Sequence, residues 1–501
     1  MQSQRPFTSR PRSRRALLGA PTSQGLTTSS RTSAGPSAPA PGPEVRVDLD
    51  VVLAHRATQG FTRRTLREIQ FLGRDAWLDR QLDPQSIPDP AVDSFVADFP
   101  SVSMSIPDLH ANFWTSTLVP CEHLQQVCVA RSVLSERQLL ERVVEFWHDH
   151  FNVDQLETHR GRLFFTSYDR DVIRPNALGT FEDLLVAVAK SPAMSAYLDG
   201  DVNVAGAPNE NFGREVMELH TLGVDGPYTE DDVKEISRCF TGWRYARWGE
   251  PNPGEFIFDA GLHDFGPKSV LGFQLPGGGG VQDGLDILHE LSVHPKTLDY
   301  VSRKLVSWLS GLEPPQAAVD AVIAVWQATG GDLKEIVRAA LSDEVLLLCE
   351  APVRRKLKRP YHFGVGLMRQ LGTRTTDRFL GASRIFDLVG HRPYIWTTPD
   401  GYPDTILAWG SDVSGRWSYA TNLLDGGLPG VSVPSAALNT LRAGVPNRAL
   451  AHRLALEMAG GLIPESEVAR VQQYIDTRVH SDQVLRDAVA LLAACPGYQF
   501  Y

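Results

Sequence analysis

The strongest constraint on the fold is a long series of helix-length segments in which apolar residues recur at helical spacing. In residues 62–82, for example, Leu66 and Ile69 lie three residues apart within a longer apolar pattern. Helix-start signals support the pattern, as where Asp232 follows Thr229 at the spacing of a capping box. The predicted helices cover residues 62–82, 181–197, 209–222, 229–243, 284–309, 315–328, 333–341, 361–371, 406–424, 449–458, 465–477 and 481–494, and a further helix, which Ser135 can cap, runs through Trp147.

Only one segment carries a convincing β-strand signal. Residues 256–258 and 269–271 are short apolar runs on either side of a turn-rich stretch, which predicts a small hairpin. The predicted fold class is therefore mainly α, a large multi-helix domain with a small β-hairpin insertion near residues 255–272. We expect residues 44–501 to form this single body, with the candidate site region within residues 140–265.

Residues 1–43 differ from the body because they are rich in Ser, Thr, Pro, Ala and Arg, which predicts a disordered leader. Within it, Arg14 and Arg15 precede the apolar residues 16–20, an order similar to that of a twin-arginine export signal. Export signals need an apolar stretch of about 7–15 residues, and this one is shorter. A working signal, a degenerate signal and a plain basic tail stay open. The protein is exported, to the periplasm or beyond, if the signal works, and is cytoplasmic otherwise.

The charge distribution excludes several kinds of partner. The net charge is −10, but residues 1–43 hold six Arg and no other charged residue, so the rest of the chain carries −16. An acidic body argues against nucleic acid or an anionic membrane as the main partner. No apolar run is long enough to predict a transmembrane segment. The five cysteines are too scattered for a disulfide framework, and we expect buried free thiols.

The first group of chemically capable residues lies in residues 145–152. Glu145 and His148 have the i, i+3 spacing that places both side chains on one face of a helix. Carboxylate-bridged metal sites in helical bundles use this spacing. His150 cannot share that face, but both histidines could reach one ion if the helix ends near Phe151.

The second group lies in residues 208–223, where Glu215 and Glu218 again share a helical face. His220 falls in the last turn of the predicted helix, where the helix dipole favours a protonated imidazole. Carboxylates this dense are costly to bury unless they are paired or bound to a metal. Arg214 could neutralise one of them, so the sequence leaves a metal site and a buried ion-pair network as alternatives.

We predict a metal-dependent enzyme, hydrolytic or oxidative and of unknown substrate, that uses iron, manganese or zinc and no nucleotide cofactor. The candidate metal ligands are Glu145, His148, His150, Glu215, Glu218 and His220. The candidate catalytic and orienting residues are Asn209, Glu210 and Arg214, with His263 and Asp264 closing over the site as proton-transfer groups. The alternative is a non-enzymatic exported scaffold or binding protein that acts with a partner. In that case the carboxylates form a buried ion-pair network, and His263 and Asp264 belong to a turn with an Asp cap.

Two further features have competing interpretations. The basic run at residues 354–359 could be a polyanion site, but a solvated helix entry or a pairing with the acidic surface is the simpler interpretation. Aromatic residues gather around residues 396–419 and could form a carbohydrate-stacking platform or pack a loop. No nucleophile-elbow, zinc-protease, phosphate-loop, dinucleotide-binding or EF-hand pattern occurs.

Several motifs in order carry a family resemblance. They are residues 145–153 (EFWHDHFNV), 174–185 (RPNALGTFEDLL), 191–199 (SPAMSAYLD), 208–223 (PNENFGREVMELHTLG), 228–243 (YTEDDVKEISRCFTGW), the His263-Asp264 loop and 399–403 (PDGYP). Together they resemble the large bacterial family DUF1800, whose biochemical activity is not established. The resemblance implies an exported protein, often with a twin-arginine signal, and a sulfatase-like partner. The chain departs from the family pattern in its short signal region and at residues 495–498 (CPGY), where the family usually has Ser-Pro-Glu-Phe.

Overall fold

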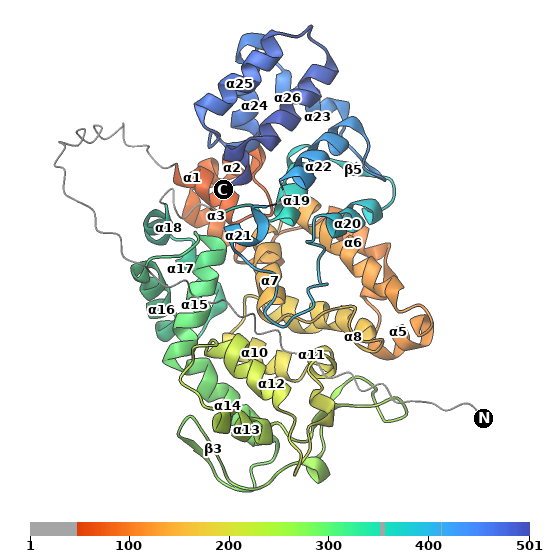
Figure 1. Ribbon diagram of the computed structural model, residues 1–501, viewed down its shortest axis with the longest axis vertical. Coiled ribbons are helices and arrows are strands. Elements are labelled where there is room, and N and C mark those ends of the chain that lie inside the picture. Colours follow the sequence, from red (N-terminus) through yellow and green to blue (C-terminus); the bar gives the residue numbers. More distant parts are fainter. Residues whose placement is uncertain (1–47, 351–355, 412) are drawn as a thin grey trace, which may run out of the picture. The chain divides into compact units, whose positions relative to one another are not determined.

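The structure is a computed structural model that describes residues 48–350, 356–411 and 413–501 (Figure 1). Residues 47–501 form one compact unit. The predictions of a disordered leader and an export signal concern residues 1–43 and lie outside the described residues.

Helices dominate the described chain, which confirms the predicted fold class. The helices before the first strand are α1 (Leu49–Arg56), α2 (Arg63–Leu72), α3 (Arg74–Gln81), α4 (Pro90–Ala97), α5 (Ile106–Phe113), α6 (Leu118–Leu134), α7 (Gln138–His150), α8 (Gly161–Ser167), α9 (Arg174–Asn176), α10 (Phe181–Ala189), α11 (Pro192–Tyr197), α12 (Glu210–Glu215) and α13 (Glu230–Cys239). Those that follow are α14 (Val281–Val293), α15 (Pro295–Leu309), α16 (Gln316–Thr329), α17 (Leu333–Ala340), α18 (Asp343–Cys349), α19 (Pro360–Gln370), α20 (Leu380–Leu388), α21 (Ile406–Trp409), α22 (Ser414–Asp425), α23 (Ser435–Arg442), α24 (Leu450–Ala459), α25 (Glu465–Asp476), α26 (Asp482–Ala494) and α27 (Pro496–Gln499). Two π-helical turns are η3 (Tyr168–Ile173) and η5 (Val216–Thr221), and short 3₁₀ turns are η1 (Pro84–Ser86), η2 (Pro100–Val102), η4 (Gly200–Val202), η6 (Ala260–Leu262) and η8 (Asn447–Ala449).

The predicted long helices are broken where the backbone requires it. Residues 62–82 form α2 and α3, which are separated by Gly73 at a φ of 83°, a conformation that favours glycine. Pro192 and Pro295 split two other predicted helices, because proline has no N–H to donate and instead begins a new helix. Ser135 is the C-cap of α6 rather than the N-cap of α7, and its hydroxyl donates to Asp89.

The strands pair differently from the prediction. β2 (Phe256–Phe258) pairs antiparallel with β1 (Trp243–Tyr245), and β3 (Lys268–Val270) pairs with β4 (Phe273–Leu275). The predicted single hairpin near residues 255–272 is therefore two hairpins, because each apolar run finds its partner outside that range. A third pair joins β5 (Arg374–Thr375) to β6 (Val431–Ser432).

Two clusters of buried side chains make up the core. The larger one surrounds α7, where Val143 and Trp147 are completely buried, and it extends through α10, α14, α15 and α17. The smaller one joins α19 to α22, α24, α25 and α26 and also receives Val129 from α6. Burial of this apolar surface is the main stabilising contribution to a helical body. In the described residues, no helix has both the length and the apolar character that a membrane crossing requires.

Candidate functional site

Helix α7 carries the first motif and presents two different faces. Its inner face packs Phe146 and Trp147 against aromatic side chains of α15 and α10. The opposite face presents Glu145, His148 and Asp149 to a cavity, since these positions lie about one turn apart. The helix ends at His150 with Phe151 as its C-cap, which is the condition under which the sequence allows both histidines to reach one ion.

The cavity beside this face, which we call the α7 cavity, has a volume of about 40 Å³, which is room for about three water molecules. Its wall combines ionisable groups with aromatic and aliphatic side chains from distant parts of the chain. The lining residues are Gln59, Cys128, Ser132, Glu141, Val144, Glu145, His148, Asp149, Asn152, Phe165, Arg174, Tyr361, His391, Pro393, Tyr394 and Tyr402.

His148 is held in place by a buried carboxylate. Its Nε2–H donates to Asp169 Oδ1 at 3.0 Å, and the other oxygen of Asp169 lies 3.2 Å from Arg131 and 3.5 Å from Arg174. Burial raises the pKa of Asp169, but Arg174, His148 and Arg131 outweigh this effect and hold the pKa well below its usual range. Because Nε2 carries the proton toward Asp169, Nδ1 is the ring nitrogen left for a molecule in the cavity.

Glu145 lies in a different set of contacts. Gln59 donates to it at 2.8 Å and His362 donates Nε2–H to it at 2.7 Å, while Arg142 lies 4.0 Å away. Burial opposes ionisation of Glu145, but His362 and Arg142 hold its pKa well below the usual range. Burial and Arg142 also lower the pKa of His362 to about 4, so the imidazole is neutral.

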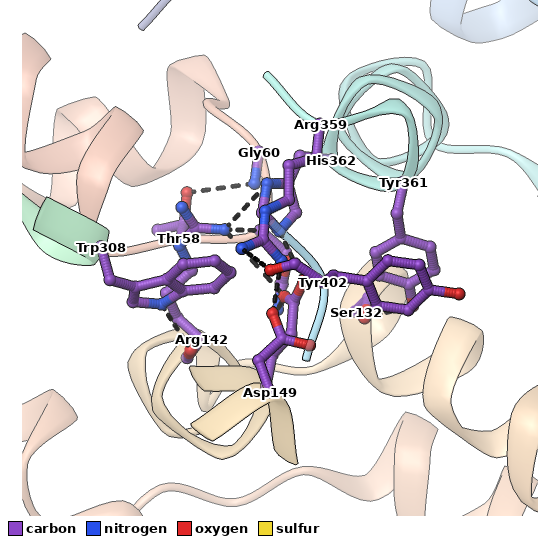
Figure 2. Close-up of polar contacts among 12 residues, drawn as sticks. Thr58, Gly60, Ser132, Arg142, Asp149, Trp308, Arg359, Tyr361, His362 and Tyr402 are labelled. Carbon is purple, nitrogen blue, oxygen red and sulfur yellow. Dashed lines mark hydrogen bonds and ion pairs between the residues drawn. The ribbon is translucent and has the colours of Figure 1, made fainter. Parts of the chain in front are cut away.

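Asp149 differs from Glu145 in the cavity wall because its pKa is raised rather than lowered. Burial raises its pKa to about 6, although Arg359 forms a close ion pair with it. Arg359 also donates to the carbonyl oxygen of Tyr402 at 3.1 Å, which fixes the loop against α7 (Figure 2). Gly401 makes this approach possible, because a Cβ there would lie 2.0 Å from the carbonyl oxygen of Asp149.

Buried charges surround Trp308 behind this wall. The guanidinium carbons of Arg142 and Arg359 lie 4.3 and 4.5 Å from the centroid of the Trp308 ring (Figure 2). Lys356 Nζ donates to the carbonyl oxygen of Ser307 at 2.8 Å and pairs with Asp404. We call this set the Trp308 network, and it consists of Arg142, Arg359, Lys356, Glu145, Asp149 and Asp404.

The basic run therefore has a different role from the one predicted. Lys356, Lys358 and Arg359 are 1 %, 6 % and 2 % exposed, so the expectation of a solvated helix entry is wrong for these residues. Asp149 and Asp404, which lie far away in sequence, supply carboxylates for Arg359 and Lys356, while Lys358 donates to the carbonyl oxygen of Tyr498. Arg354 and Arg355 lie outside the described residues.

The second motif forms a cluster at the surface. Arg214 contacts Glu210 at 3.3 Å, Glu218 at 3.4 Å and Glu230 at 2.7 Å, and we call these four residues the Arg214 cluster. All four are partly or largely exposed. Glu215 is more buried, and burial followed by the nearby Glu218 raises its pKa to about 7.

Asn209 caps α12, as its position before the helix suggests. Its side-chain oxygen accepts the N–H of Asn211 at 2.9 Å, and its amide donates to the carbonyl oxygen of Asp199 at 3.1 Å. Both contacts are local, so the described role of Asn209 is to fix the helix start.

A π-helical turn places His220 in the interior rather than at an exposed helix end. After α12 the chain continues as η5, and His220 is completely buried with neither ring nitrogen hydrogen-bonded. Burial, and then the charge of Lys304, lower its pKa to about 3. The predicted protonation by the helix dipole is therefore wrong. The structure does bring two predicted ligands together, since His150 donates Nε2–H to the carbonyl oxygen of His220 at 3.1 Å.

His263 and Asp264 take part in two separate local networks. His263 contacts the carbonyl oxygen of Thr241 at 2.7 Å and Asp283 at 3.2 Å. Asp264 accepts the N–H of Gly266 at 2.9 Å and pairs with Arg238 at 2.8 Å, which lowers its pKa to about 2. Neither residue lines the α7 cavity. The arrangement agrees with the alternative of a turn stabilised by an aspartate.

The candidate metal ligands are thus distributed over several networks. Among the described residues, no group of three or more His, Cys, Asp or Glu side chains could hold a metal ion. His148 is committed to Asp169, Glu145 to His362, and Glu218 to Arg214. The residues present do not fit a shared metal centre, and metal dependence stays a prediction.

Sequence reasoning missed the residues that orient the motif side chains. His362 meets Glu145 across 217 positions of sequence, and Asp169 meets His148 across 21. The one available signal for His362 was its position just after the basic run, because a buried cationic segment brings its neighbours into the core.

Of the aromatic group around residues 396–419, Tyr402 and Tyr419 are buried and Trp417 is about half exposed, which favours loop packing over a stacking platform.

Comparison with known proteins gave one match. A family model described as "Protein of unknown function (DUF1800)" matches residues 52–500, nearly the whole chain. No curated protein and no solved structure matched the chain significantly.

Proposed function

The chain belongs to the DUF1800 family, and from this premise we propose that it is an enzyme that catalyses hydrolysis by acid–base proton transfer in the α7 cavity. The family description names no activity, so the proposal depends on the site. The observation that carries it is the His148–Asp169 pair in the wall of a cavity. A ring nitrogen fixed by a buried carboxylate is the arrangement by which many enzymes orient a general base.

The base in this proposal is His148. Its Nδ1 accepts a proton from a water molecule while the water oxygen attacks an electrophilic carbon of the substrate. Asp169 stabilises the imidazolium that forms and stays ionised, because Arg131 and Arg174 hold its charge. The proton taken from the attacking water therefore stays on His148 until a later proton-transfer step.

The acid in this proposal is Asp149, which lines the same cavity. Its pKa of about 6 keeps part of the population protonated near neutral pH, so it can donate to a leaving group. His148 and Asp149 are neighbours in sequence, and both side chains reach the cavity because α7 ends one residue later. His148 and Asp149 thus line the same wall of the α7 cavity but lie in different local environments.

The lining favours a small, uncharged and polar substrate. Ser132, Asn152 and Tyr361 offer groups for hydrogen bonds, while Phe165 and Pro393 offer apolar contacts. Arg174 and Arg142 balance the charges of Glu141 and Glu145 in the wall, so these carboxylates do not favour an ionic substrate. A predicted metal requirement is not part of this route.

The test is hydrolysis of a panel of chromogenic esters, amides and glycosides by the full chain. His148→Gln and Asp169→Asn should each lower the rate by about 10²–10⁴-fold. Asp264→Asn is the matched control, because Asp264 pairs with Arg238 outside the cavity, and it should keep the wild-type rate. Absence of hydrolysis across the panel, or a full rate in His148→Gln, would contradict the proposal.

A second candidate is the non-enzymatic scaffold that acts with a partner. The observation that favours it is the mutual pairing of buried charges around Trp308, which serves stability without any reaction. This candidate predicts no hydrolysis, and binding of a partner protein that His148→Gln leaves unchanged. Pull-down from a native extract with wild type and His148→Gln side by side measures the second property.

A further inference from the structure

Two small adjoining cavities lie away from the proposed reaction and share His55 and Tyr501 as lining residues. Their volumes are about 30 and 10 Å³. The larger also meets Arg56 and Glu350, and the smaller also meets Arg142, Lys358 and His362. We call them the Arg56 cavities.

Three cationic side chains reach these cavities, and all of them are buried. Arg56 and Arg142 are 1 % exposed, and Lys358 is 6 % exposed. Burying a cation is costly unless its donors find acceptors, so each N–H group should have a partner.

Arg56 lacks such partners. Among the described residues, its only charged contact is Nη2 to Glu350 at 3.6 Å, longer than a normal hydrogen bond. Nε and Nη1 are buried and have no hydrogen-bond acceptor in the same part of the chain. The ring of Tyr501, whose centroid lies 5.2 Å from the guanidinium carbon, covers one side of the group and supplies no lone pair in its plane.

The smaller of the Arg56 cavities also contains a cation with an unpartnered donor. Arg142 Nε is buried and has no acceptor, although its terminal nitrogens contact His362 and the Tyr501 hydroxyl. Lys358 donates to the carbonyl oxygen of Tyr498 at 2.7 Å, and its Nζ lies 3.6 Å from the centroid of that ring.

His55, which lines both cavities, does not supply the missing hydrogen-bond acceptors. His55 donates Nε2–H to the carbonyl oxygen of Ala459 at 3.3 Å. Burial, with Lys358 and Arg56, lowers its pKa well below the usual value, so it adds no positive charge. One neutral nitrogen lone pair cannot satisfy the unpartnered donors of both Arg56 and Arg142.

We propose that the Arg56 cavities bind a small inorganic anion, halide-sized or a compact oxyanion, that accepts hydrogen bonds from Arg56 and draws on the charges of Lys358 and Arg142. A negative charge is the natural occupant because the unpartnered donors belong to cations. The larger volume, about 30 Å³, suits a compact anion. Gln59, which donates to Glu145, lines both the smaller Arg56 cavity and the α7 cavity.

The first test is thermal unfolding of the full chain in sodium bromide or sodium phosphate, with ionic strength held constant by sodium gluconate. Above the Kd, each tenfold rise in the free anion concentration should raise the melting temperature by about 2 °C. Arg56→Gln should abolish the rise. Arg369→Gln is the matched control, since Arg369 is a buried cation that lines none of these cavities, and it should keep the rise.

The second test covers the case in which Arg56→Gln does not fold. Crystals of the wild-type protein soaked in bromide should show an anomalous peak within hydrogen-bond distance of Arg56. A response to bromide identifies a halide site and a response to phosphate alone identifies an oxyanion site, and either supports the proposal. A flat titration in the wild type, an equal rise in Arg56→Gln, or only water density beside Arg56 would overturn it.

Discussion

The Trp308 network and the Arg214 cluster are both built from arginine and carboxylates, but they differ in burial. In the Trp308 network, Arg142 and Arg359 are almost completely buried, and the carboxylate partners of Arg359 come from distant segments. In the Arg214 cluster, Arg214 is about a third exposed and contacts residues four positions away on its own helical segment. Arginine and carboxylate side chains therefore form a buried charge network around Trp308 and a solvated cluster around Arg214.

The difference teaches that burial, rather than motif density, decides where carboxylates acquire unusual properties. Asp149 and Asp169 both lie in the interior, and their pKa values move in opposite directions because their cationic neighbours differ. Glu218, in the exposed cluster, is held by one contact at 3.4 Å. The sequence prediction grouped Glu145 and Glu218 into one metal site, whereas in the structure Glu145 contacts His362 and Glu218 contacts Arg214.

The largest expected effect is in the buried region. Asp169→Ala leaves Arg131 without a carboxylate partner among the described residues and removes one of the two carboxylate partners of Arg174, and should destabilise the protein by about 3–5 kcal/mol. Urea denaturation at neutral pH measures the change. Asp169→Asn keeps the shape and one acceptor, and should cost less. Equal and small effects of both variants would mean that solvent reaches this network.

A smaller effect on stability should come from the titration of Asp149 with pH. Its folded pKa of about 6 lies above the usual value for an aspartate, so the folded state holds its proton more tightly than the unfolded state. The resulting stability is present at low pH and is lost as pH rises through 6, by roughly 2–3 kcal/mol in total.

Asp149→Asn removes this titration and isolates it from the carboxylates whose pKa values are lowered. The wild type should therefore lose stability relative to Asp149→Asn between about pH 4 and pH 7. Urea denaturation of both proteins across this range is the measurement. A constant difference would show that Asp149 has an ordinary pKa.

Much of the fold was predictable because it depends on local chemistry. The capping box at Thr229 and Asp232 is present, and Ser481 caps α26 where the predicted helix begins. Proline positions could have indicated the helix breaks at Pro192 and Pro295. The hairpins were mispaired because short apolar runs do not specify their partners.

The candidate site was only partly predictable. The sequence selected Glu145 and His148 on α7, and both line the cavity. It could not supply Asp169 or His362, because the contacts between them and the motif depend on tertiary packing. It also could not foresee the π-helical turn that buries His220, since the spacing of the segment fits an ordinary helix equally well.

A small effect is expected in the exposed region. Glu218→Ala removes one contact of the Arg214 cluster, in which Arg214 keeps Glu210 and Glu230. Exposed pairs contribute less than about 1 kcal/mol, so the melting temperature should fall by no more than about 2 °C. Thermal unfolding of the variant beside Glu210→Ala checks this value. A sharp loss of stability would turn the cluster into a structural element comparable to the Trp308 network.

The smallest effect should come from removal of metal. The candidate ligands from the two regions do not meet in a shared group among the described residues, so chelation with EDTA should leave the melting temperature unchanged. Elemental analysis of protein purified without a histidine tag gives a direct measure, with less than about 0.2 equivalents of transition metal expected. A stoichiometric metal whose loss lowers the melting temperature would restore the metal hypothesis. If Glu218→Ala and His150→Ala also abolished its binding, the two regions would form one site in solution, and the contrast between them would no longer hold.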